Sequence, residues 1–74
     1  MRRPGSATID PLKLRLARLR RRLRQRDIAA SVAVAPQRIS DFEQGLRHPT
    51  LEQVAVLARV LGPEIFADNT EVGG

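Results

Sequence analysis

The chain has 74 residues, one histidine and no cysteine, so we expect one small domain with neither a disulfide framework nor a Cys/His zinc site. No apolar stretch is long enough to span a membrane, and no signal-peptide core follows the basic N-terminus, so we expect a soluble, cytoplasmic protein. Residues 1–26 hold ten basic groups and one acid, a net charge of +9, whereas residues 27–74 hold three basic groups and seven acids, a net charge of −4. This asymmetry predicts that one end of the molecule engages nucleic acid, a lipid surface or an acidic protein, and does not choose among them.

The first expected helix covers residues 11–22. Asp10 can cap its start, Pro11 suits its first position, and Ile9 can pack against Leu14 as a hydrophobic staple. Its apolar residues form two stripes at helical spacing: Leu12, Leu16, Leu19 and Leu23 in one, Leu14 and Ala17 in the other. A helix that packs on one side requires only one apolar stripe. If Leu14 and Ala17 face the core, Leu12, Leu16 and Leu19 are therefore expected to be partly exposed.

Two further short helices are expected at residues 25–32 and 36–44. The first is rich in alanine, and residues 33–35 interrupt it. Pro36 restarts a helix because its fixed φ and its missing N–H suit a first helical turn. Gly45 ends that helix as a left-handed cap residue.

A fourth helix is expected at residues 51–61. Thr50 and Gln53 have the spacing of a capping box at its start, and Gly62-Pro63 ends it. The residues predicted to face inward are Leu51, Val54, Leu57, Ala58 and Leu61.

The predicted fold is all-α, because no strand pattern or repeat appears: a compact four- to five-helix domain over residues 10–67. A last turn is expected at residues 64–67, with Phe66 in the core. Residues 1–9 contain proline, glycine and serine without periodicity and are expected to form a flexible basic arm. Residues 68–74 are expected to form a disordered tail.

Two short helices joined by a three-residue turn, the second opening with polar side chains, are typical of the helix-turn-helix motif. Individual residues also match a known family. They are Leu14, Arg18, Leu23, Gln25, Ile28, Ala29, Val32, Val34, Ile39, Ser40, Phe42, Glu43, Gly45, Pro49, Thr50, Leu51, Leu57, Ala58, Leu61 and Gly62. Residues 14–62 thus resemble the phage-repressor or Cro-type helix-turn-helix domain, also called the xenobiotic-response-element type. The resemblance implies a repressor-like fold that binds DNA.

The resemblance also implies a structural ion pair between the first and third helices, formed by Arg18 and Glu43; the alternative is two independent surface charges. The sequence departs from the family at three positions. Where the family usually has glycine before the second helix, glycine in the turn and serine or threonine capping the third helix, this chain has Arg22, Ala33 and Ala35. A left-handed alanine costs roughly 1 kcal/mol relative to glycine, and a lost cap costs about as much.

In this family the third helix lies in the major groove, and its early residues meet base edges. The resemblance therefore assigns base reading to Pro36, Gln37, Arg38, Ser40 and Asp41. Gln37 can pair with adenine and Asp41 can accept a hydrogen bond from cytosine, whereas Arg38 can instead clamp a phosphate. The alternative for this polar face is plain solvation.

Phosphate groups are expected at the N-terminus of the second helix, where free N–H groups and the helix dipole favour anions. The residues assigned to phosphate binding are Arg24, Gln25, Arg26 and Arg47, of which Gln25 matches the family's phosphate-contacting residue. Arg2 and Arg3 can reach into a neighbouring minor groove, with disorder alone as the alternative. His48 is expected to be a surface residue rather than a ligand.

We therefore expect a sequence-specific regulator of transcription that binds double-stranded DNA in the nucleoid without a cofactor or metal. A domain of this size reads only a few base pairs, which favours a homodimer on a palindromic operator. Its dimer or partner surface is expected at the leucine-rich first helix, or near Ile65 and Phe66. The main alternative is an antitoxin or adaptor of a toxin–antitoxin pair, which binds a protein partner and regulates its own operon.

Two other classes fit the sequence less well. A basic, leucine-rich first helix also suits a membrane-surface peptide, but the arginines that surround the leucines and the capped downstream helices argue against it. We do not expect an enzyme, because the sequence has no metal-ligand cluster, no nucleophile–base pair and no glycine-rich phosphate loop.

Overall fold

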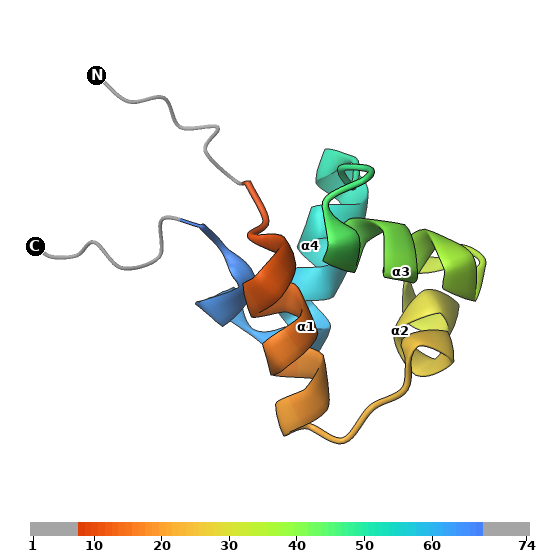
Figure 1. Cartoon of the computed structure of the whole chain (residues 1–74), viewed down its shortest axis with the longest axis horizontal. Helices are drawn as coiled ribbons and strands as arrows, with labels where there is room; N and C mark the ends of the chain where they lie inside the picture. The colour runs from red at the N-terminus through yellow and green to blue at the C-terminus, as the bar shows by residue number, and fades with distance from the viewer. Residues whose placement is uncertain (1–7, 68–74) are drawn as a thin grey trace, which may run out of the picture.

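Four α-helices and one 3₁₀ turn follow one another through residues 8–67, the part of the chain that the computed structural model describes (Figure 1). They are α1 (Pro11–Arg20), α2 (Gln25–Val32), α3 (Pro36–Gln44), α4 (Leu51–Leu61) and η1 (Pro63–Ile65). The predicted all-α fold is confirmed, and the bounds of α2, α3 and α4 coincide with those predicted. The predicted tail and the first seven residues of the predicted arm lie outside the described residues. Within residues 8–67, no helix has the length and apolar character needed to cross a membrane.

The start of α1 follows its capping signals, but its end does not follow the prediction. The Asp10 carboxylate accepts the N–H groups of Leu12 at 2.9 Å and Lys13 at 3.2 Å, which satisfies donors that a helix start leaves unpaired. The helix ends at Arg20, two residues before the predicted end. The reason is a left-handed backbone at Arg22, which turns the chain out of the helix.

The first three helices all end in the same hydrogen-bond pattern, each built around one left-handed residue. These residues are Arg22 (φ 58°), Ala33 (φ 65°) and Gly45 (φ 77°). After α1, the Leu23 N–H donates to the Arg18 carbonyl at 3.1 Å and the Arg22 N–H donates to the Leu19 carbonyl at 2.9 Å. This is the Schellman arrangement, in which glycine is the usual left-handed residue. Two of the three turns therefore place a β-carbon in a conformation that costs roughly 1–2 kcal/mol.

Every helix contributes to one cluster of buried apolar side chains. Its largest fully buried members are Leu14, Ile28, Ile39, Leu57, Leu61 and Ile65. α2 packs against α3 and α4, while α1 packs against α3 and η1, so α3 is held from two directions. In Figure 1, α2 and α3 lie on the side of the molecule away from both ends of the described chain.

The segment before α1 pairs with the segment after η1. Ile9 and Phe66 form an antiparallel bridge, and Ile9 is only 3% exposed. Beside them, the Ala67 N–H donates to the Thr8 carbonyl at 2.8 Å. Ile9 therefore belongs to the folded domain, and the predicted end of the arm at residue 9 is too late.

Some details of the C-terminal part of the domain also differ from the prediction. Leu51, expected to face inward, is 73% exposed at the first position of α4. The last turn covers Pro63–Ile65 rather than residues 64–67, because the proline starts it. Ile65 is completely buried and cannot form the dimer surface suggested for it, while Phe66 packs against the core but is only partly buried.

Candidate nucleic-acid interface

Arg18 of α1 and Glu43 of α3 form a two-pronged ion pair. The Arg18 Nε lies 2.6 Å from the Glu43 Oε2, and the Arg18 NH2 lies 3.1 Å from the Oε1. Only 11% of the Arg18 side chain and 4% of the Glu43 side chain are exposed. The remaining amino group of Arg18, NH1, donates to the Leu23 carbonyl at 3.0 Å. The pair therefore joins α1 and the turn that follows it to α3.

Gln25, the first residue of α2, is held by the same carboxylate. Its Nε2 donates to the Glu43 Oε1 at 3.1 Å. A carboxylate only accepts hydrogen bonds, so this contact uses one amide N–H of Gln25 and leaves the second N–H and the carbonyl oxygen for another ligand. A groove of about 270 Å³ lies beside this contact and is lined by Arg15, Arg18, Gln25, Ser40, Glu43 and Gln44. The fold thus brings the start of α2 next to the outer side of α3.

α3 buries an apolar side and presents a polar one. Its buried residues are Ile39 and Phe42. Of the residues assigned to base reading, Pro36 and Gln37 are exposed, and Arg38, Ser40 and Asp41 are partly buried. All five therefore keep some accessible surface on one short helix.

Polar side chains on this side of α3 bond to one another and to the next loop. Gln37 Nε2 donates to Asp41 Oδ1 at 3.1 Å, and Gln44 Nε2 donates to Ser40 Oγ at 2.8 Å. The Asp41 Oδ2 lies 3.5 Å from the Nε of Arg47, which follows α3. The sequence predicted separate contacts to DNA for Gln37, Asp41 and Arg47, whereas the structure links the three.

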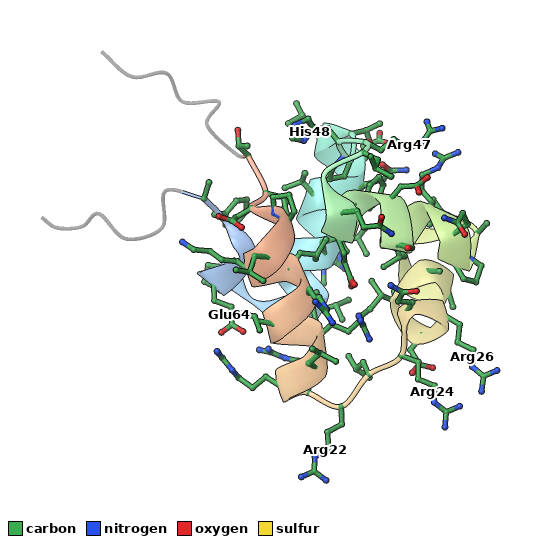
Figure 2. All side chains as sticks on the ribbon, in the orientation of Figure 1. Arg22, Arg24, Arg26, Arg47, His48 and Glu64 are labelled. Atoms are coloured by element: carbon green, nitrogen blue, oxygen red, sulfur yellow. The ribbon has the colours of Figure 1, made fainter. Side chains whose placement is uncertain are left out.

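The N-terminus of α2 has the features of an anion site. Arg24 and Arg26 are exposed on either side of its first residue, and Figure 2 shows them, with Arg22, projecting away from the body of the molecule. The Asp27 carboxylate accepts the Arg24 N–H at 2.8 Å. The backbone N–H groups of Gln25 and Arg26 have no acceptor among residues 8–67. Such free N–H groups at the positive end of a helix dipole favour a bound anion.

Arg47 and His48 lie in the loop between α3 and α4. In Figure 2 they are at the opposite end of the molecule from Arg24 and Arg26. The Arg47 side chain is 54% exposed, so its contact with Asp41 leaves it accessible. His48 is exposed, which agrees with its predicted place at the surface.

The arginines at the end of α1 are used differently from those near α2. Arg20 NH1 and Arg21 NH1 lie 3.3 Å and 3.0 Å from the same carboxylate oxygen, Oε2 of Glu64. These two side chains are thereby directed toward η1 rather than toward the start of α2. Among residues 18–26, the arginines thus divide into those that pair with a glutamate, Arg18, Arg20 and Arg21, and those that project without such a partner, Arg22, Arg24 and Arg26.

Comparison with curated proteins returned no match, and neither did comparison with solved structures. A model of the helix-turn-helix domain family, in contrast, matches residues 12–63. That range begins in α1, ends at the first residue of η1 and contains the Arg18–Glu43 pair, both short helices and the turn between them. The chain therefore belongs to the helix-turn-helix domain family, a family of DNA-binding domains.

Proposed function

We propose that this chain is a transcriptional regulator that binds double-stranded DNA with sequence specificity, inserting α3 into the major groove. The observation that carries the proposal is the polar side of α3. The helix packs inward through Ile39 and Phe42, and its polar side leaves Gln37 and Ser40 accessible beside the arginine-flanked start of α2. A helix in the major groove reads base edges with such side chains, while arginines and helix N-termini hold the phosphates.

Phosphate binding is assigned to two places that flank the polar side of α3: the start of α2 and the loop after α3. Arg24, Arg26 and the second amide N–H of Gln25 would bind one strand at the start of α2. Arg47, in the loop after α3, would bind a phosphate at the other end. These contacts supply affinity that is independent of sequence and that depends on salt. The protein then acts as a binding protein in the nucleoid, with no catalytic step.

We further propose that it binds as a homodimer to a palindromic operator. One helix of this length contacts only a few base pairs, and two copies related by a two-fold axis would read two half-sites. The surface for the second copy is assigned to the leucine stripe of α1, formed by Leu12, Leu16 and Leu19. These side chains are 57%, 46% and 47% exposed, an unusual concentration of apolar surface for so small a domain.

Selection of bound sites from a pool of random duplexes tests the proposal. The expected result is an enriched motif with two inverted half-sites about one helical turn apart, together with a complex of two protein chains per duplex by light scattering. Enrichment of no sequence would contradict specific binding. Enrichment of one asymmetric half-site by a single chain would contradict the homodimer alone.

An antitoxin or adaptor is the second candidate, and the same leucine stripe favours it. In that case the stripe would bind a different protein, and DNA binding would serve autoregulation. Co-expression with the product of the neighbouring gene distinguishes the two functions. A stable complex that is lost when Leu12, Leu16 and Leu19 are replaced by serine supports the adaptor. A dimer of this chain alone that is lost in the same variant supports the homodimeric regulator.

A further inference from the structure

Asp41 lies at the centre of a chain of contacts that joins α3 to the loop after it. Its Oδ1 accepts a hydrogen bond from Gln37 Nε2 at 3.1 Å, and its Oδ2 lies 3.5 Å from Arg47 Nε. Its backbone carbonyl also accepts the Leu46 N–H at 2.9 Å, within the Schellman turn that ends the helix. The side chain of Asp41 is only 19% exposed. Both carboxylate oxygens thus have partners within the protein.

These contacts dictate the orientation of the Gln37 amide. A carboxylate accepts hydrogen bonds and donates none, so the NH2 end of the amide must face Asp41. One N–H is then used, and the second N–H and the carbonyl oxygen remain available on an exposed side chain. Adenine presents N7 as an acceptor and its N6 amino group as a donor in the major groove, which matches that remaining pair of groups.

We infer that Asp41 is a positioning residue for DNA reading, which fixes the Gln37 amide in the orientation that selects adenine and holds Arg47 beside the reading helix. This inference rests on the proposed function and replaces the prediction that Asp41 itself reads cytosine. Arg47 in turn affects Asp41. Its positive charge balances the Asp41 carboxylate, which would otherwise lie unpaired near the phosphates of bound DNA.

The inference is tested by the base pair at which discrimination is lost in Asp41→Ala and in Gln37→Ala. The full chain is titrated with its selected duplex and with duplexes that carry each single base-pair substitution, at fixed salt. Gln37→Ala identifies the base pair that Gln37 reads. Asp41→Ala is expected to lower the preference at that same base pair by roughly 2- to 10-fold, with no added loss in the double variant. Asp41→Asn retains an oxygen acceptor for Gln37 and is expected to restore the preference.

Gln44→Ala serves as the matched control, because it removes another hydrogen bond between side chains one turn apart on α3. It should leave the preference at the Gln37 base pair unchanged. A loss at a different base pair in Asp41→Ala, adding to that of Gln37→Ala, would show that Asp41 reads a base and would overturn the inference. Unchanged discrimination at every base pair would overturn it too.

A measurement on the free protein separates this inference from the proposed function. The side-chain amide resonances of Gln37 are expected to shift in Asp41→Ala and to stay near their original positions in Asp41→Asn, with circular dichroism verifying that both variants fold. If the resonances behave in this way but no duplex is selected, the contact exists and the proposed function fails. If the resonances do not change in Asp41→Ala, the positioning role fails whatever the protein binds.

Discussion

The arginines on the two sides of the α1–α2 turn carry the same charge and are used in opposite ways. Those at the end of α1 pair with glutamates: Arg18 with Glu43, and Arg20 and Arg21 with Glu64. The next three, Arg22, Arg24 and Arg26, have no acid within ion-pair distance among residues 8–67. The difference shows that net charge alone does not locate a DNA-binding surface. The Arg18–Glu43 pair is largely buried, whereas Arg20 and Arg21 share the one carboxylate of Glu64 at the surface. We propose that Arg24 and Arg26, which have no such partner, bind phosphates.

The largest expected effect is on stability, and it distinguishes the buried Arg18–Glu43 pair from the exposed pairs of Glu64. Glu43→Ala should lower the free energy of unfolding by about 3–5 kcal/mol, because it leaves the guanidinium of Arg18 without its charge partner in a largely buried site. Glu64→Ala removes a carboxylate from an accessible site and should cost about 1 kcal/mol or less. Urea unfolding followed by circular dichroism gives both values. Equal losses in the two variants would mean that the Arg18–Glu43 pair is no more structural than a surface pair.

The next effect separates the recognition of a base pair from the attraction between arginines and phosphates. Gln37→Ala should weaken binding to the selected duplex by roughly 1–3 kcal/mol, with the loss confined to one base pair. It removes no charge, so the dependence of affinity on salt should stay as it is in the parent protein. Titration of the parent and variant against the substituted duplexes measures both properties. Unchanged selectivity would remove Gln37 from the reading surface.

A smaller effect on stability is expected at Arg22, in the turn between α1 and α2. Arg22 has a left-handed backbone, so Arg22→Gly should raise the free energy of unfolding by roughly 0.5–1 kcal/mol. If the side chain binds phosphate, the same variant should also bind all duplexes more weakly. Ala33→Gly is the matched control, because it relieves the same backbone conformation without changing the charge. A gain in stability with no loss of DNA affinity in Arg22→Gly would place Arg22 outside the interface.

Much of the fold could be predicted because most helix boundaries carry chemical signals. Pro36, Gly45 and Thr50 mark starts and ends that the structure reproduces. The end of α1 has no such signal: a run of arginines leads into the left-handed Arg22, where glycine would have marked the turn. Leu51 was misplaced because helical spacing identifies a stripe but does not say whether its first residue, at the helix start, reaches the core.

The candidate site was less predictable. The Gln37–Asp41 bond has the i, i+4 spacing of helical side-chain pairs, but two other contacts of the site join different elements of the fold. The bond from Gln25 to Glu43 and the ion pair of Asp41 with Arg47 have no local pattern. The family resemblance predicted the Arg18–Glu43 pair, but it assigned Asp41 to direct base reading, independent of Gln37 and Arg47. Only the folded arrangement shows that both of its carboxylate oxygens are engaged within the protein.

The central claim, that the projecting Arg24 and Arg26 bind phosphates whereas the Glu64-paired Arg20 and Arg21 do not, is tested most directly by two variants of equal charge. One replaces Arg24 and Arg26 by alanine, and the other replaces Arg20 and Arg21. The affinity of each for duplex DNA is measured over a range of salt concentrations. Loss of two phosphate contacts should reduce the slope of log affinity against log salt by about 1.8 in the first variant, and the second should keep the slope of the parent protein. Equal reductions in both variants would contradict the division between paired and projecting arginines.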